Sequence, residues 1–219
     1  MAKIKNLPES QESEAYNRKQ LKIGEINLMF ATIEDKQALS LEVFLALPET
    51  KPAREYYHGI VTQKPMPKGK HSILQFELAS AINQQTKPQK LAYALPELRC
   101  TFAERSIVPD IAVIRWENLP RDIDGEMADQ FLRYPDWIIE IMSPEQSVTL
   151  GMEKIIFCLQ QGTELGWLID PSAKSVTVFQ TGLPKVHIAT EGNNEPLAVI
   201  KGLERWSISA VDIFAWLKV

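Results

Sequence analysis

Two carboxylates stand where a carboxylate is costly unless it has a partner. Asp110 follows Pro109 at the head of an apolar run, and Glu140 lies inside the apolar run over 137–142. Burying an unpaired carboxylate costs several kcal/mol, so each must meet a cation, a set of donors or a metal ion. If the two strands are neighbours, the pair can bind one hard cation, because Mg²⁺ typically takes one or two carboxylates together with waters and substrate phosphate.

Two further side chains are candidates for the same chemistry. Lys154 follows Glu140 on the next predicted helix, where its ammonium can hold an attacking water or a non-bridging phosphate oxygen. Glu77 lies at the boundary of the apolar stripe of another predicted helix and is a candidate third acid, as a ligand of metal-bound water or as a base. The sequence therefore predicts a catalytic set of Asp110, Glu140, Lys154 and Glu77, with Asp110 and Glu140 as the metal ligands.

Each of these residues also has a simpler interpretation. Lys154 and Glu77 can be solvated helix residues, and Asp110 can be an ordinary strand-start residue. The alternative for Glu140 is an internal salt bridge to Arg99, Arg115 or Arg133.

Other catalytic chemistries find little support. The histidines and cysteines form no zinc-ligand pattern, and His58 and His71 are interpreted as hydrogen-bonding surface groups. Ser143 and Ser147 lack the GxSxG setting of a serine hydrolase. Neither GxGxxG nor GxxxxGK[ST] occurs, so no phosphate-cradling glycine loop is predicted.

Hydrophobic periodicity predicts a mixed α/β chain with the sheet in the middle. Helices are predicted at 39–47, 71–85, 149–161 and after Ser209. Strands are predicted at 56–63, 107–115, 137–142, 165–169, 175–179, 186–189 and 197–200. The acidic stretch 117–129 is predicted to be a solvated loop. Residues 1–20 are predicted to be a flexible arm, followed by a single domain over 21–219.

The composition excludes several classes of protein. The 219 residues are 45% hydrophobic and 24% charged, which is typical of a globular chain rather than a disordered or coiled-coil one. The formal net charge of −4 predicts no general basic surface, so any nucleic-acid role must rest on a local site. Segment 51–105 has nine Lys and Arg residues against four Asp and Glu. That excess suits an enzyme acting on a polyanion, although a solvated helix face explains the same count.

The sequence favours a cytoplasmic protein that does not enter a membrane. Cys100 and Cys158 fit no disulfide framework, which favours a reducing compartment. The first residues are polar where a signal peptide would be apolar, and no run of about 18 apolar residues occurs. The apolar residues over 206–217 are candidates either for the core or for a homodimer surface.

The arrangement of these residues resembles the PD-(D/E)XK nuclease superfamily, and more closely a restriction-endonuclease-like family long catalogued as a domain of unknown function. The resemblance covers about four fifths of the chain. It rests on the order and spacing of short pieces: Arg54-Glu55-Tyr56, His58-Gly59, His71, Pro96-Glu97-Leu98-Arg99, Val108-Pro109-Asp110-Ile111, Tyr134-Pro135-Asp136, Ile139-Glu140-Ile141-Met142-Ser143-Pro144, Lys154, Gly162 and Trp167-Leu168-Ile169-Asp170-Pro171.

This resemblance implies a restriction-endonuclease-like fold, a central mixed sheet flanked by helices. It also implies that Asp110 and Glu140 bind Mg²⁺, with Mn²⁺ as a possible substitute, and that DNA is the partner. Lys154 matches the lysine that the family places in the following helix, and Glu55 is a further acid of the same site besides Glu77. The chain departs from the common pattern at Met142, where the superfamily has lysine, and at His58, Cys158 and Leu165-Gly166.

Three functions follow as hypotheses. The first is a Mg²⁺-dependent endonuclease that hydrolyses DNA phosphodiester bonds. The second is a binding module for nucleic acid or protein on the same fold that no longer cuts, which the departures at Met142 and Cys158 keep open. The third, a carboxylate-pair hydrolase acting on sugars, gains nothing from Lys154.

Overall fold

The computed structural model describes residues 39–144, 146–180 and 182–218. The arm predicted over 1–20 lies outside these residues, as do residues 21–38 of the predicted domain. None of the helices within the described ranges combines the length and the apolar character that a membrane crossing requires.

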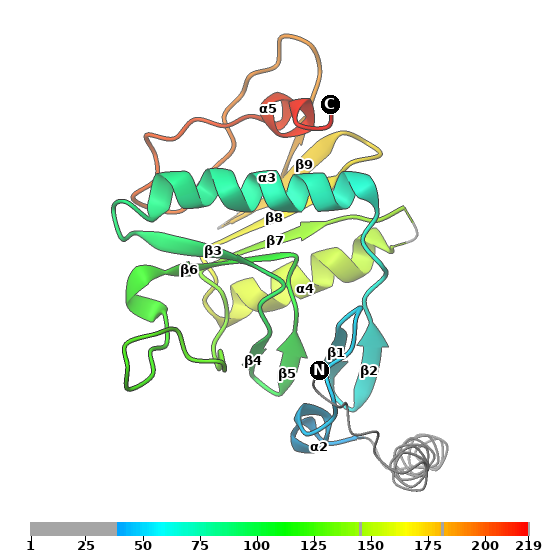
Figure 1. Ribbon diagram of the computed structural model, residues 1–219. Helices are drawn as coiled ribbons and strands as arrows, with labels where there is room; N and C mark the ends of the chain where they lie inside the picture. Colours follow the sequence, from blue (N-terminus) through cyan, green and yellow to red (C-terminus); the bar gives the residue numbers. More distant parts are fainter. Residues whose placement is uncertain (1–38, 145, 181, 219) are drawn as a thin grey trace, which may run out of the picture.

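A six-stranded mixed sheet forms the centre of the molecule (Figure 1). Its strands run in the order β10-β9-β8-β7-β6-β3, and only the β7–β8 pair is parallel. The bounds are β3 (Ala92–Pro96), β6 (Ile111–Arg115), β7 (Trp137–Ile141), β8 (Leu165–Asp170), β9 (Ser175–Phe179) and β10 (Lys185–Ile188). A parallel pair needs a crossover connection, and the helix that follows β7 supplies it.

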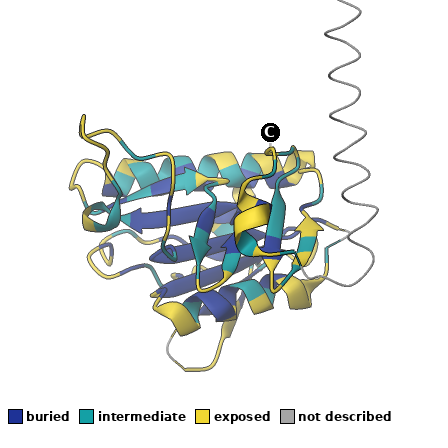
Figure 2. Cartoon of the chain, turned by 90° about the horizontal axis from the view of Figure 1, so that it is seen from below, coloured by how far each residue is buried: buried dark blue, intermediate teal, exposed yellow. Residues whose placement is uncertain are grey.

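Helices cover both faces of this sheet (Figure 1). They are α3 (Gly69–Thr86) on one face, α4 (Val148–Gln161) on the other, and a short α5 (Ala210–Ala215) packed beside α3. Figure 2 shows the strands of the sheet buried between helices whose outer surfaces are exposed. Gly162 ends α4 with a φ of 116°, a left-handed conformation that glycine adopts without steric cost.

The alternation of strand β7 decides where its carboxylate points. Trp137, Ile139 and Ile141 belong to the core cluster that contains the apolar residues of α3. Ile138 belongs instead to the cluster that contains Ile155 of α4. Because successive side chains of a strand point to opposite faces, Glu140 lies on the same face as Ile138, toward α4.

A second, four-stranded antiparallel sheet lies beside α4, in the order β2-β1-β5-β4 (Figure 1). Its strands are β1 (Arg54–Tyr57), β2 (Ile60–Gln63), β4 (Cys100–Phe102) and β5 (Arg105–Ile107), and the short helix α2 (Leu41–Leu45) precedes them. The single strand predicted over 56–63 is therefore wrong. It is a hairpin, because His58 and Gly59 both take positive φ, 44° and 84°, and form its two-residue turn.

Several other predictions are also corrected. The strand predicted over 107–115 is two strands in different sheets, because β5 ends at Ile107 and β6 begins only at Ile111. The three residues between them pass from one sheet to the other, and Pro109, which lacks an N–H, suits that break. Residues 197–200 form no strand, and β3, β4 and β5 were not predicted as separate strands.

The remaining elements confirm the prediction in outline. The helices at 41–45, 69–86, 148–161 and 210–215 correspond to the four predicted ones, and Ser209 caps the last of them in a capping box with Asp212. The 117–129 stretch holds no strand and only the end of a short 3₁₀ helix (Trp116–Asn118). The apolar residues of 206–217 belong to the core: Ile213 and Phe214 are buried, and Trp206 and Trp216 pack against them.

Candidate active site

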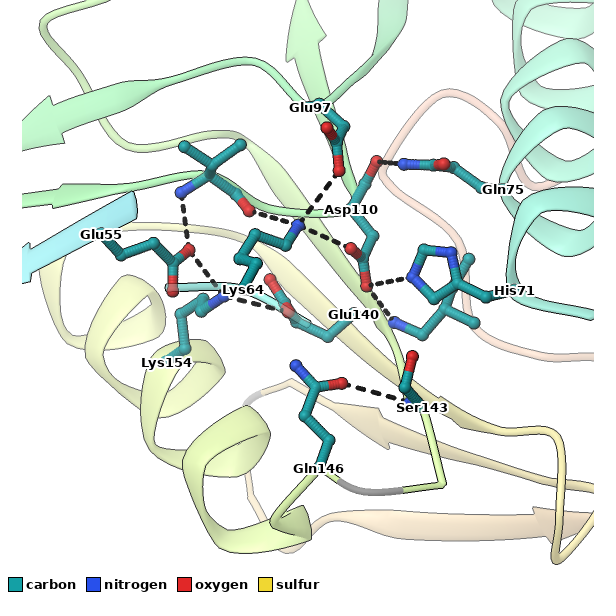
Figure 3. A network of polar contacts seen from close by, with 12 residues as sticks. Glu55, Lys64, His71, Gln75, Glu97, Asp110, Glu140, Ser143, Gln146 and Lys154 are labelled. Carbon is teal, nitrogen blue, oxygen red and sulfur yellow. Dashed lines mark hydrogen bonds and ion pairs between the residues drawn. The ribbon is translucent and has the colours of Figure 1, made fainter. Parts of the chain in front are cut away.

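The fold brings Asp110, Glu140 and Lys154 into one buried polar cluster (Figure 3). Strands β6 and β7 are neighbours, with Ile111 paired to Ile139, so Asp110, which immediately precedes β6, lies beside Glu140 of β7. Lys154 stands on the face of α4 that packs against β7. The three residues that the sequence predicts as the centre of the site are therefore together.

Asp110 has partners on both carboxylate oxygens. Its Oδ1 lies 2.7 Å from the Nζ of Lys64, and its Oδ2 accepts a hydrogen bond from the N–H of Ile141 at 2.7 Å. The Nε2 of His71 lies 3.2 Å from the same Oδ2. Burial by itself would raise the pKa of Asp110, but the hydrogen bond from His71 and the charge of Lys64 hold that pKa well below its usual range.

Glu140 is less completely partnered. Its Oε2 accepts a hydrogen bond from the Nζ of Lys154 at 3.1 Å, and its Oε1 is buried with no hydrogen-bond partner among the described residues. Burial raises the pKa of Glu140 to about 7, against the attraction of Lys154 and with added repulsion from Asp110. Glu140 thus holds an open acceptor inside the protein.

Lys154 and Lys64 are both held as ammonium ions. Lys154 also donates to Glu55 Oε1 at 2.8 Å, and the charges of Glu140 and Glu55 outweigh burial and raise its pKa. Lys64 donates to the main-chain oxygen of Val108 at 2.8 Å, and the charge of Asp110 likewise raises its pKa in spite of burial. Each lysine is the cation next to one of the two central acids.

The structure adds residues that the sequence analysis did not place in the site. Lys64, at the end of β2, was not singled out, although a lysine at a strand end between Gln63 and Pro65 is a weak signal. The interpretation of His71 as a surface group is wrong: it is buried, and it contacts Asp110 from the first turn of α3. One turn further along α3, Gln75 donates to the main-chain oxygen of Asp110 at 2.8 Å.

The two further acids fare differently. Glu55 joins the cluster: its Oε1 accepts from Lys154 and, at 2.7 Å, from the main-chain N–H of Val108. Glu77 is half-buried on α3, and within the described part of the chain no contact joins it to the cluster. Its catalytic role stays a prediction. The salt bridge expected as the alternative for Glu140 exists, but with Lys154, since Arg99, Arg115 and Arg133 pair with Glu49, Glu164 and Asp136.

A cleft of about 610 Å³ opens onto the cluster between the small sheet and α4. Four of the charged residues already described line it: Glu55, Lys64, Glu140 and Lys154. The rest of its lining comes from the β1–β2 hairpin, from Arg105 and Ile107 of β5, and from residues 146–160. The cluster is buried in the fold and also accessible to a ligand in the cleft.

The donor set fits one hard divalent cation with few protein ligands. Within the described ranges no group of three or more His, Cys, Asp or Glu residues is placed to hold a metal. Glu140 Oε1, however, is a buried carboxylate oxygen without a partner, which is the kind of ligand Mg²⁺ prefers. Without counting His71, the cluster also holds four carboxylates, Glu55, Glu97, Asp110 and Glu140, against two lysines. Asp110 can be the second ligand of the cation only if the ammonium group of Lys64 moves away from Oδ1 of Asp110.

The fold and site define a class of protein. A central mixed sheet with helices on both faces, and an acid pair at two neighbouring strands, one member of which lines a cleft, is the restriction-endonuclease-like architecture that the resemblance implied. The sequence model of the Uma2 family, described as "Putative restriction endonuclease", matches residues 41–211, and the chain belongs to this family.

A solved structure agrees with this assignment. It is described as a putative nuclease belonging to DUF820 from Anabaena variabilis ATCC 29413, and it is 46% identical to this chain with a TM-score of 0.78. The match covers 82% of this chain and 99% of the other. No curated protein matches the sequence. The resemblance drawn from the sequence is thus confirmed at the level of the family and the fold.

Proposed function

We propose that this protein is a divalent-metal-dependent endonuclease that hydrolyses DNA phosphodiester bonds, with Mg²⁺ as the metal and Mn²⁺ as a substitute. The observation that carries the proposal is the convergence of Asp110, Glu140 and Lys154 in one cluster, of which Glu140 and Lys154 line a cleft and Glu140 Oε1 is buried without a partner among the described residues. A carboxylate pair and a charged lysine at an accessible cleft are the groups that metal-assisted phosphodiester hydrolysis requires.

Each side chain has a distinct task in this proposal. Glu140 Oε1 and an oxygen of Asp110 hold the cation, whose presence lowers the pKa of a water and neutralises the scissile phosphate. Lys154 orients the attacking water or a non-bridging phosphate oxygen and offsets the charge that develops in the transition state. Glu55 accepts from Lys154 and fixes the position of the ammonium group.

Lys64 must release one contact for the cation to reach Asp110. Its Nζ lies 2.7 Å from Oδ1, so the ammonium and a metal ion cannot both occupy that position. Two other acceptors remain within reach, the main-chain oxygen of Val108 at 2.8 Å and Glu97 Oε1 at 3.5 Å. Lys64 therefore keeps hydrogen-bond partners after it leaves Asp110.

A binding module that no longer cuts is the second candidate. The pairing of Lys64 with Asp110 and of Lys154 with Glu140 favours it, because these ion pairs compensate both acids without any metal. Met142, where the superfamily has lysine, favours it too. The sugar hydrolase gains no support, because a lysine accompanies each of its two candidate carboxylates.

The deciding experiment is cleavage of supercoiled plasmid with Mg²⁺, Mn²⁺ or EDTA in the buffer. We expect metal-dependent nicking by the wild type. Glu140→Ala should lose at least about a hundredfold in rate, because it removes a ligand of the metal ion that stabilises the charge of the transition state. Glu153→Ala is the matched control, because Glu153 is an exposed glutamate that lines the same cleft. Nicking by Glu140→Ala at the wild-type rate would overturn the assignment.

Calorimetry with Mn²⁺ separates the two candidates if the plasmid stays intact. Mn²⁺ binding by the wild type that is lost in Glu140→Ala supports a nuclease with a metal centre and a substrate range that excludes the plasmid. The absence of Mn²⁺ binding by folded wild-type protein supports the module that no longer cuts. Sedimentation velocity of the same sample tests the homodimer, which stays a prediction.

A further inference from the structure

Part of the lining of the same cleft is apolar, and this part is called the apolar slot. Two large side chains of the β1–β2 hairpin and two of α4 line it while remaining between 40% and 60% exposed: Tyr57, Ile60, Leu150 and Ile156. Exposed apolar residues scattered singly need no explanation, but a group that lines one cleft marks a binding surface. Here the group shares that cleft with Glu140 and Lys154 of the catalytic cluster.

One wall of the slot is held by a ladder of stacked planar groups. The guanidinium of Arg105 lies 3.5 Å from the ring centroid of Tyr57 and 3.7 Å from that of Phe157. Phe157 in turn stacks on Phe102, with centroids 5.2 Å apart and planes 15° from parallel. The ladder ties the small sheet to α4, so this wall is fixed before a ligand arrives.

Arg105 also brings a positive charge to the slot, where its guanidinium lies against the rings of Tyr57 and Phe157. No ion pair joins it to an acid within the described ranges, and its Nε is buried without a hydrogen-bond partner. Lys64 and Lys154 line the same cleft. A ligand that fits therefore has an apolar, planar part beside an anionic part.

The charge of the cleft argues against a rigid duplex as the ligand. Three acids, Glu55, Glu140 and Glu153, balance three bases, Lys64, Arg105 and Lys154, so the lining has no net positive charge. Duplex binding depends on many phosphate contacts by basic side chains. A single strand gains additional affinity from the stacking of its unpaired bases on aromatic side chains, a contribution that a duplex with paired bases does not offer.

We propose that the slot binds an unpaired nucleobase of the strand that is cut, and that the substrate class is single-stranded DNA or duplex DNA with unpaired nucleotides. The inference rests on the proposed function, because it places the phosphate of the same strand at Lys154 and Glu140. The base lies between the hairpin and α4, with Tyr57 and Ile60 on one side and Leu150 and Ile156 on the other.

The test is binding of fluorescein-labelled oligonucleotides, followed by anisotropy in EDTA so that nothing is cleaved. Three probes of equal length are compared: a single strand, its duplex, and an abasic strand that keeps the phosphates without the bases. We expect the single strand to bind at least tenfold more tightly than either of the others. Equal binding of the single strand and the abasic strand would overturn the proposal, as would preference for the duplex or no binding of any probe.

Variants assign the effect to the slot. Ile60→Ser with Leu150→Ser should weaken binding of the single strand at least about fivefold, or about 1 kcal/mol, because two apolar side chains that contact the base are removed. It should leave binding of the abasic strand unchanged. Both side chains are exposed, so the variant should fold, which circular dichroism checks. Ile123→Ser is the control, because Ile123 is fully exposed on a loop that does not line the cleft.

The outcomes stay distinguishable from a failure of the proposed function. Plasmid nicking that Glu140→Ala abolishes, together with unchanged oligonucleotide binding by the Ile60→Ser, Leu150→Ser variant, would reject the slot and keep the nuclease. A wild-type dimer that this variant converts to a monomer would show that a second copy of the chain covers the slot, and would also reject the proposal.

Discussion

Asp110 and Glu140 are 1% and 2% exposed and lie side by side, Asp110 just before β6 and Glu140 in the neighbouring β7, yet their pKa values are shifted in opposite directions. Asp110 meets three donors or cations, from Lys64, His71 and the N–H of Ile141. Glu140 meets Lys154 alone, and Lys154 also donates to Glu55. Burial costs the two acids a similar penalty, and the number of partners decides which of them stays charged.

This difference separates a structural half from a chemical half within one cluster. The Asp110 half is satisfied in the metal-free protein and links β2, α3, β6 and β7. The Glu140 half keeps an open oxygen and a pKa near neutrality, which is the state of a group that gains most from a cation. Shifted pKa values at a cleft are typical of functional groups, and here only one of the two acids is left unsatisfied.

Removing Asp110 should produce the largest effect. Asp110→Ala removes the nearer, buried carboxylate from the ammonium of Lys64 and leaves it the half-exposed Glu97 at 3.5 Å. Breaking a buried pair costs about 3–5 kcal/mol of unfolding free energy. Urea denaturation in EDTA measures the loss. Asp110→Ala together with Lys64→Met should recover part of the stability, and a double variant no more stable than the single one would show that the pair is not the cause.

Glu140 should make stability fall as pH rises. Its pKa is raised from 4.5 to about 7 in the folded state, so the folded protein binds more protons than the unfolded chain between these values. The contribution is fully present below about pH 4.5 and is lost as pH rises through about 7, on the order of 3 kcal/mol. Glu140→Gln, which resembles the protonated acid, should be more stable than the wild type at pH 8 in EDTA. A wild type and a Gln variant with the same pH profile would contradict the shift.

Lys64 should oppose metal binding more than Lys154 does. Lys64 lies on the oxygen of Asp110 that a cation needs, whereas Lys154 leaves Glu140 Oε1 open. Lys64→Met should tighten Mn²⁺ binding by about tenfold, or about 1.4 kcal/mol, measured by calorimetry at pH 8. Lys154→Met is the matched control, because it also removes a positive charge that repels the metal ion. Equal gains in Mn²⁺ affinity in the two variants would show that the metal ion need not displace Lys64 from Asp110.

Among the variants judged by unfolding free energy, His71→Phe should give the smallest effect. It contributes one of the three partners of Asp110, at the longest of the three distances, 3.2 Å. His71→Phe should cost about 1–2 kcal/mol of unfolding free energy, the usual range for one buried hydrogen bond together with the partner it leaves behind. Chemical denaturation at pH 8 measures it, with Gln75→Leu as a companion on the same face of α3. A loss as large as that of Asp110→Ala would mean that His71, not Lys64, holds the acid in place.

The sequence predicts the acids better than their partners. Glu140 stands out because a lone glutamate among isoleucines needs a physical reason, and Lys154 follows from the family resemblance. Lys64 and His71 carry no such local signal: the Lys64 contact with Asp110 spans 46 positions, and only the tertiary fold brings the two together. Glu77 stands on a helix whose apolar stripe is blurred by the exposed Phe76, so periodicity does not fix which side of α3 faces the site.

The fold shows the same division between local and tertiary information. Helices and the long buried strands have strong periodic patterns, and they are found close to their predicted positions. The short strands of the small sheet have no strong periodic pattern. β4 and β5 are three residues each, which is too short for an alternation of apolar and polar residues to be recognised. The sequence pattern over 56–63 predicts one strand with Gly59 inside it. Gly59 instead forms the turn of a hairpin together with His58.

The passage from β5 to β6 at Val108-Pro109-Asp110 has a consequence for synthesis of the chain. The cluster takes Glu55 and Lys64 from one sheet, Asp110 and Glu140 from the other or its edge, and Lys154 from the crossover helix, in that order along the sequence. No nascent chain that ends before Lys154 can hold the complete cluster. A ribosome-bound or truncated product therefore carries the acids without their last cation, and the complete site exists only after both sheets and α4 have been made.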